Sequence, residues 1–151
     1  MKGVKKYLFL MAVVAALFGF VACSNDDDGA SKVAVYASDE ETFTFYDNNT
    51  FKNVDTIKGK KYTLATGTYK GDVTKDTGDG NNVTATVKKY AYVKKGAEKL
   101  TFSSIKDYAK YASKTYDGIT TKEIIEYFTD MPVTIQDGEL TILEETYTKK
   151  N

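Results

Sequence analysis

The feature that most constrains the fold is an alternation of apolar and polar residues in most of the chain beyond residue 32. In Thr42–Tyr46 this alternation puts Phe43 and Phe45 on one face, and Thr50–Ile57 alternates again after the turn residues 47–49. Alternation with a period of two is typical of a strand with one buried face. Asn and Asp tolerate the left-handed backbone of tight turns. The segment 42–57 is therefore predicted to be an antiparallel hairpin.

Further strands are expected at 60–72, 83–93 and 100–102, with residues 76–82 as a loop. Gly67 is placed to allow a bulge, because Leu64 and Tyr69 otherwise fall on opposite faces. A final hairpin turns at Asp137-Gly138, the kind of dipeptide that tight hairpins prefer. Its apolar positions are Val133 and Ile135 before the turn, and Leu140, Ile142 and Tyr147 after it.

The period changes from two to that of a helix between residues 104 and 128. Ser104 is a candidate cap for a helix over 105–113, and Thr120 to Glu123 fits a capping box that opens a second short helix. Pro132 is expected to close this helical insert. Helix is therefore predicted only within about 104–128.

The predicted fold class is mainly β, with seven or eight antiparallel strands and a short helical insert. So many strands close either as a barrel or as a β-sandwich. The runs Thr42–Phe51, Gly67–Gly71 and Asp137–Ile142 resemble small bacterial lipocalin-like surface lipoproteins. The resemblance implies a lipocalin-like barrel, with the sandwich as the alternative, although the tryptophan motif of the main lipocalin family is absent because the chain has no Trp.

The N-terminus resembles a lipoprotein signal peptide of the Bacteroidota or spirochaete type. Lys2, Lys5 and Lys6 precede the uncharged stretch Tyr7–Ala22, which ends at Cys23, the one cysteine in the sequence. The resemblance implies that residues 1–22 are removed and that Cys23 carries acyl chains such as palmitate. The alternatives are an ordinary secretory signal and an uncleaved anchor, which is shorter than the about 20 apolar residues of a membrane span.

The remaining chain divides into a polar tether at 23–32, acidic at residues 26–28, and one β domain at 33–151. An acidic tether after the lipidated cysteine also resembles a surface-export signal, and the alternative is a plain solvated linker. The expected location is the bacterial cell envelope, with the lipid anchor in the outer membrane and the domain exposed at the surface.

Composition argues against several classes of function. The chain has 21 basic and 21 acidic residues and no His, and every basic residue is Lys. This balance does not suggest a nucleic-acid binder. The absence of His removes the usual general base at neutral pH, and with Cys23 acylated no thiol is left for catalysis or metal binding. We therefore expect no enzyme activity, no cofactor and no metal.

Two sets of residues are candidates for binding. Phe43, Phe45, Phe51, Tyr62 and Leu64 could line a barrel that holds a small apolar or amphipathic ligand, or they could simply pack against one another. Exposed cations and aromatics could contact a glycan or a host protein; the same pattern also fits an edge strand protected by lysines. This second set is Lys88, Lys89, Tyr90, Tyr92, Lys94 and Lys95.

Three weaker signals remain in the sequence. Asp76, Asp79, Asn81 and Asn82 offer oxygen atoms to calcium but do not have the EF-hand spacing, so a solvated turn is the better interpretation. Ser103 to Lys106 fits Ser-x-x-Lys, but a helix cap explains it better. Lys106, Lys110 and Lys114 form a stripe that is either a solvated helix face or a contact for anionic headgroups. A glycan hydrolase built on two carboxylates remains the weakest functional alternative.

Overall fold

The computed structural model describes residues 29–57, 59–93 and 99–151. Nine strands and two helices lie in these ranges. The strands are β1 (Lys32–Ala37), β2 (Glu41–Tyr46), β3 (Thr50–Ile57), β4 (Lys60–Lys70), β5 (Val83–Val93), β6 (Lys99–Phe102), β7 (Met131–Gln136), β8 (Glu139–Ile142) and β9 (Glu145–Lys149). The helices are α2 (Ile105–Thr115) and α3 (Thr121–Tyr127).

Eight of these strands form a closed antiparallel barrel. The hydrogen-bonded order is β4-β3-β2-β1-β9-β8-β7-β5, and pairing between β4 and β5 closes the ring. β6 pairs with β5 outside the ring. The fold-class prediction is confirmed, and the barrel is the form adopted rather than the sandwich. Closure removes the free edges that a sandwich would leave.

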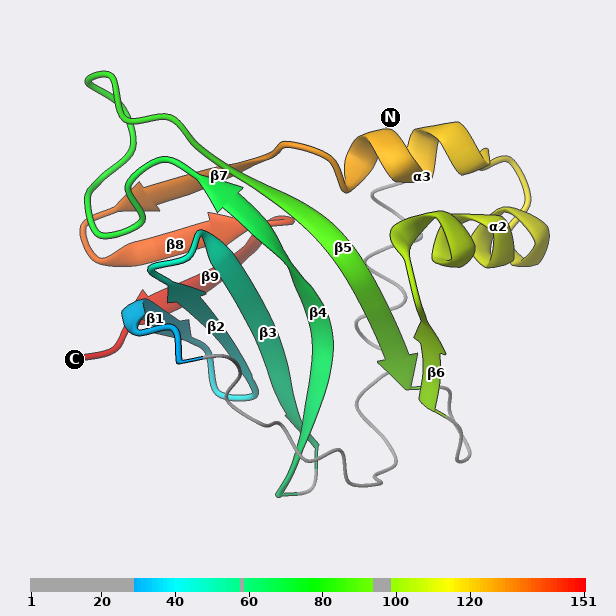
Figure 1. Cartoon of the computed structure of the whole chain (residues 1–151), viewed down its shortest axis with the longest axis horizontal. Coiled ribbons are helices and arrows are strands. Elements are labelled where there is room, and N and C mark those ends of the chain that lie inside the picture. The colour runs from blue at the N-terminus through cyan, green and yellow to red at the C-terminus, as the bar shows by residue number, and fades with distance from the viewer. Residues whose placement is uncertain (1–28, 58, 94–98) are drawn as a thin grey trace.

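Figure 1 shows the two ends of the barrel. The end of β3 and the start of β4, like the end of β5 and the start of β6, lie at the lower end, whereas the long green loop at 71–82 lies at the upper left end. This loop covers its end of the barrel, because the Tyr36 hydroxyl donates to the carbonyl of Val73 at 2.7 Å and the backbone amide of Thr77 donates to the carbonyl of Ile135 at 2.8 Å. Val73, a residue of this loop, is itself buried.

The core of the barrel is aromatic. Phe45 is fully buried and contacts Tyr36, Phe51 and Tyr69, with ring centroids 6.2, 6.1 and 5.1 Å away. Phe43 lies beside it and meets the ring of Tyr147 edge-on at 4.9 Å. Such edge-to-face pairs are favourable beyond the area that they bury. Side chains therefore fill this half of the barrel.

Two of the three register shifts in the described sheet involve β4, and they change which residues face inward. The β3–β4 register shifts between Asn53 and Val54, and the β4–β5 register shifts between Thr66 and Gly67. The register does shift beside Gly67, but the extra residue there is Lys88 on β5, and the extra residue of β4 is Leu64 rather than Gly67. The second shift also turns Tyr90 to the face of Val87, although simple alternation predicts opposite faces for them.

Three details of the sequence prediction are wrong. β5 is not an edge strand, because it pairs with β4 on one side and with β7 and β6 on the other. Pro132 lies within β7 and does not close the helical insert. The residues after the Asp137-Gly138 turn form two strands, since the chain turns again at Leu143 and Glu144, which both have positive φ.

The helices lie beside β5 and β6 at one side of the barrel (Figure 1). The Ser104 hydroxyl accepts from the amide of Asp107, and Thr120 with Glu123 forms the predicted capping box. Both helices lie within the predicted range. Tyr108 and Phe128 pack on Tyr90 with centroids 4.6 and 5.5 Å away, which joins the helices to the core. None of the helices in the described ranges is long and apolar enough to cross a membrane.

Candidate functional site

A row of three polar side chains crosses neighbouring strands of the barrel wall. Glu41 on β2 is paired directly with Asp55 on β3, and Asp55 is paired directly with Tyr62 on β4. Residues directly opposite one another in antiparallel strands have Cβ atoms about 5 Å apart on the same face. We call Glu41, Asp55 and Tyr62 the polar row.

The polar row faces the inside of the barrel. On β3 the buried residues alternate with half-buried ones, and Asp55 belongs to the buried set with Phe51, Asn53 and Ile57. Asp55 is 5% exposed and Tyr62 is 1% exposed. Ile57 and Tyr62 form a small apolar cluster apart from the main core, with Leu64 packed against them. The row therefore lies towards the β3–β4 hairpin, away from the aromatic half of the barrel.

Glu41 is well supplied with hydrogen bonds. Its Oε2 accepts from the hydroxyl of Tyr147 at 3.0 Å and from Nδ2 of Asn53 at 3.2 Å. Asp55 Oδ1 and the Tyr62 hydroxyl, in contrast, are buried and have no hydrogen-bond partner among the described residues. Buried polar groups are nearly always hydrogen-bonded, so two adjacent exceptions need an explanation.

Burial and neighbouring charges shift the pKa values of the ionisable residues in and around this site. Burial, followed by repulsion from Glu41 and Glu40, raises the pKa of Asp55 to about 6. Burial and the neighbouring Glu41 likewise raise the pKa of Tyr147 and of Tyr90. The charges that act most strongly on Asp55 are thus both negative. A carboxyl group whose pKa lies near neutrality can bind a cation or exchange a proton at neutral pH.

The five residues predicted to line a ligand site lie in two groups. Phe43, Phe45 and Phe51 belong to the aromatic core and pack against one another, with centroid distances of 6.1 to 6.4 Å. Tyr62 and Leu64 lie beside Ile57 in the separate small cluster. Ligand binding by this set stays a prediction, and only Tyr62 belongs to the polar row.

The predicted surface set is also divided. Lys88 and Lys89 are exposed, whereas Tyr90 is half-buried against the helices. The side chain of Tyr92, and Lys94 and Lys95, lie outside the described parts of the chain. Contact with a glycan or host protein through these residues stays a prediction.

An open pocket of about 140 Å³ lies at the junction of β4, β5 and β6. Its lining includes Leu64 from the predicted ligand-lining residues, and Lys89 and Tyr90 from the predicted surface residues. Its remaining lining residues are Thr63, Ala65, Thr66, Ala91 and Thr101. No carboxylate lines this pocket, so it is distinct from the polar row.

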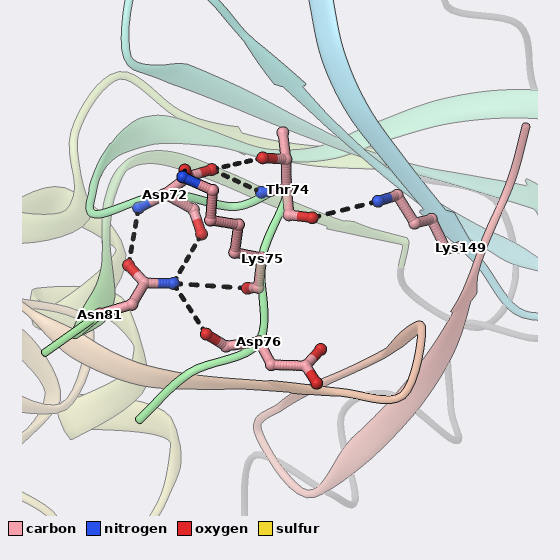
Figure 2. Close-up of polar contacts among 6 residues, drawn as sticks. All are labelled: Asp72, Thr74, Lys75, Asp76, Asn81 and Lys149. Carbon is pink, nitrogen blue, oxygen red and sulfur yellow. Dashed lines mark hydrogen bonds and ion pairs between the residues drawn. The ribbon is translucent and has the colours of Figure 1, made fainter. Parts of the chain in front are cut away.

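The acidic loop at 71–82 is organised by one amide side chain (Figure 2). Nδ2 of Asn81 donates to the carbonyls of Asp72, Lys75 and Asp76 at 2.9, 3.4 and 3.1 Å, and Oδ1 accepts from the amide of Asp72. Asp72 pairs with Lys75 at 2.9 Å. Asn81 thus serves as the internal brace of the loop. Among the residues that the structure describes, no three metal-ligating side chains come together.

Two further predicted features lie on α2 and at its N-terminus. Lys106, Lys110 and Lys114 are exposed on α2, and Ser103 donates to Oδ2 of Asp107 at 2.7 Å as part of the helix start. Cys23, residues 1–22 and most of the tether at 23–32 lie outside the described residues, so their predicted roles stay predictions.

Sequence reasoning missed Glu41, Asn53 and Asp55. A signal was present, because Asn53 and Asp55 share the period of Phe51 and Ile57 and so belong to the inward face of their strand. Polar residues at inward positions are unusual and mark either a hydrogen-bonded network or a site. Their meeting with Glu41 depends on the register between β2 and β3, which the alternation leaves open.

No protein-family model matches this chain, and neither a curated protein nor a solved structure matches it.

Proposed function

We propose that this protein is a lipid-anchored component of the bacterial cell envelope whose barrel binds a small amphipathic ligand without catalysis. The N-terminal pattern that ends at Cys23 supports the anchor, and it also supports an outer-membrane, surface-exposed location. The resemblance of the runs Thr42–Phe51, Gly67–Gly71 and Asp137–Ile142 to lipocalin-like lipoproteins supports the binding role.

The observation that carries the binding role is the pair of unpartnered polar atoms inside the barrel. Asp55 Oδ1 and the Tyr62 hydroxyl lack partners among the described residues, although their side chains are buried. Leaving such groups unsatisfied costs about 1–3 kcal/mol each. A ligand that brings polar atoms to this end and apolar atoms to Ile57 and Leu64 would recover that cost. The filled aromatic half would act as the rigid support of the site.

Native mass spectrometry of the full chain, extracted in detergent, tests both parts. We expect a mature protein that begins at Cys23 with the added mass of two or three acyl chains. We also expect a second, non-covalent species that carries a small molecule. A chain that keeps residues 1–22 without added acyl mass would contradict the anchor.

Substitution of the cysteine tests the anchor in cells. The Cys23→Ala variant should leave the membrane fraction or accumulate as an unprocessed precursor, because a single apolar segment of this length without acyl chains holds a membrane weakly. Cell fractionation with immunoblotting measures this. Lys2→Gln, which changes the same region but keeps the cysteine, should remain membrane-bound after processing.

The adjacent carboxylates favour one second candidate, a glycan hydrolase. Retaining and inverting glycosidases use two carboxyl groups, of which one has a raised pKa, and Glu41 with Asp55 has this character. The binding role is preferred because Oε2 of Glu41 already accepts hydrogen bonds from Tyr147 and Asn53, which commits this carboxylate to the barrel wall. Release of reducing sugar from envelope or host glycans, lost in both Asp55→Asn and Glu41→Gln, would establish the hydrolase instead.

A further inference from the structure

We infer that the ligand is an organic cation, an amphipathic molecule whose protonated amine or ammonium head binds at the polar row of Glu41, Asp55 and Tyr62. This inference rests on the proposed binding function and specifies the ligand for that site.

The first argument is the sign of the charge. Asp55 stands directly opposite Glu41 across the β2–β3 pairing, and the nearby Glu40 is also acidic. Like charges directly opposite one another destabilise a sheet. An anionic head would add to this repulsion, whereas a cation would offset it. The charge pattern therefore selects against carboxylate, phosphate and sulfate heads.

The second argument is the supply of hydrogen bonds. Oε2 of Glu41 already accepts from Tyr147 and Asn53, whereas Oδ1 of Asp55 accepts from no described residue. The hydroxyl of Tyr62, the residue paired with Asp55 on β4, also has no partner in the described ranges, and Tyr62 is 1% exposed. An alkylammonium has three N–H donors and no acceptor. Each of these oxygens is an acceptor that such a donor can satisfy.

The third argument is the surroundings of the head. Ile57 and Leu64 pack beside Tyr62, so apolar surface adjoins the unpartnered hydroxyl. Tyrosine rings also attract cations through their π faces. A metal ion would need more ligands, and no group of three metal-ligating side chains occurs in the described part of the chain. These surroundings fit an organic ammonium with a short apolar tail.

The test uses three small probes of equal chain length on the full chain in non-ionic detergent. These are n-butylammonium, neutral n-butanol and anionic butyrate, titrated at pH 7.5 and followed by saturation-transfer NMR. We expect butylammonium to bind at least tenfold more tightly than butanol, and butyrate to bind more weakly than butanol. Asp55→Asn should weaken butylammonium binding at least tenfold, and Tyr62→Phe several-fold.

The matched control is Asp137→Asn, which removes an exposed carboxylate in the β7–β8 turn. Asp137 has a φ of 52°, a conformation that Asn also tolerates, and this variant should bind butylammonium like the native chain. Circular dichroism confirms that each variant is folded.

The outcomes separate the inference from the proposed function. If butanol binds as tightly as butylammonium and Asp55→Asn changes neither affinity, the barrel binds ligands, but the inference that the ligand has a cationic head is refuted. The cationic head is also refuted if Asp137→Asn weakens binding as much as Asp55→Asn, because the effect is then one of general charge. If no probe binds and native mass spectrometry finds no ligand, the inference and the proposed function are both refuted.

Discussion

At the scale of single residues, Asp55 is a carboxyl group that the fold buries. Its pKa is raised to about 6 by burial and by Glu41 and Glu40, against 3.8 for the ordinary group. Well below pH 3.8 the Asp55 carboxyl is neutral in both the folded and the unfolded state. The pKa shift then contributes nothing to the free energy of unfolding. Above pH 6 the folded state must keep a disfavoured charge. Native stability should therefore fall as the pH rises from about 4 to 6.

Asp55→Asn removes this charge and keeps the shape of the side chain. We expect the variant to be more stable than the native chain at pH 8 by about 3 kcal/mol, since each pKa unit corresponds to about 1.4 kcal/mol. The gain should disappear near pH 4. Urea unfolding at pH 4, 6 and 8 measures it. A gain that is equal at all three values would show that the charge of Asp55 is not its cause.

Gly67 is a second residue that the fold requires, because a side chain does not fit at its position. A Cβ atom at this position would collide with the backbone carbonyl of Thr86 on β5 and would lie 2.8 Å from the ring of Phe51. The carbonyl cannot yield without moving the β4–β5 pairing that closes the barrel. Glycine is therefore required here for close approach of two strands.

Gly67→Ala should destabilise the protein by about 1–3 kcal/mol, the usual cost of overpacking. Thermal unfolding followed by circular dichroism measures the change. Thr68→Ala, at an exposed position of the same strand, is the control and should change stability by less than about 0.5 kcal/mol. Equal stability of the Gly67→Ala variant would contradict the close approach.

At the scale of elements, the loop at 71–82 depends on the amide of Asn81. Three of its four hydrogen bonds use Nδ2 as donor, to Asp72, Lys75 and Asp76 (Figure 2). Lys149 on β9 also reaches the loop, donating to the carbonyl of Thr74 at 3.2 Å. A carboxylate in place of the amide would oppose three carbonyl oxygens.

Asn81→Asp should therefore destabilise the protein by about 2–3 kcal/mol, because three acceptors lose their donor and the new charge meets only oxygen atoms. Hydrogen exchange should show faster exchange at the loop amide of Thr77. The matched control is Asn82→Asp, the same change at an exposed neighbour, which should leave both readouts nearly unchanged. Similar losses in the two variants would refute the bracing role. Added calcium should rescue neither variant.

At the scale of the whole molecule, closure of the barrel depends on β9. This strand pairs with β1 through Tyr36↔Lys149 and with β8 through Leu140↔Tyr147, so it joins the first strand to the last hairpin. The backbone amide of Lys150 adds a bond to the carbonyl of Val35 at 2.8 Å. Tyr147 also donates to Glu41 in the polar row.

A chain truncated after Glu144 should lose cooperative unfolding, because β1 and β8 would become free edges and the polar row would lose Tyr147. Denaturant unfolding with tyrosine fluorescence tests this. Removal of Asn151 alone should preserve the transition. A truncated chain that unfolds cooperatively at the same denaturant concentration would contradict the dependence of the barrel on β9.

Local chemistry in the sequence determined the strands, the helices and most turns. Alternation located Thr42–Tyr46 and Thr50–Ile57, and capping residues located the starts of both helices, because these signals depend on neighbours within a few residues. Only the tertiary structure decided that the sheet closes through β4 and β5, that a register shift turns Tyr90 inward, and that Glu41 stands opposite Asp55. Alternation assigns a face to each side chain but not a partner strand. The partner follows from packing and hydrogen bonding between segments that are distant in the chain.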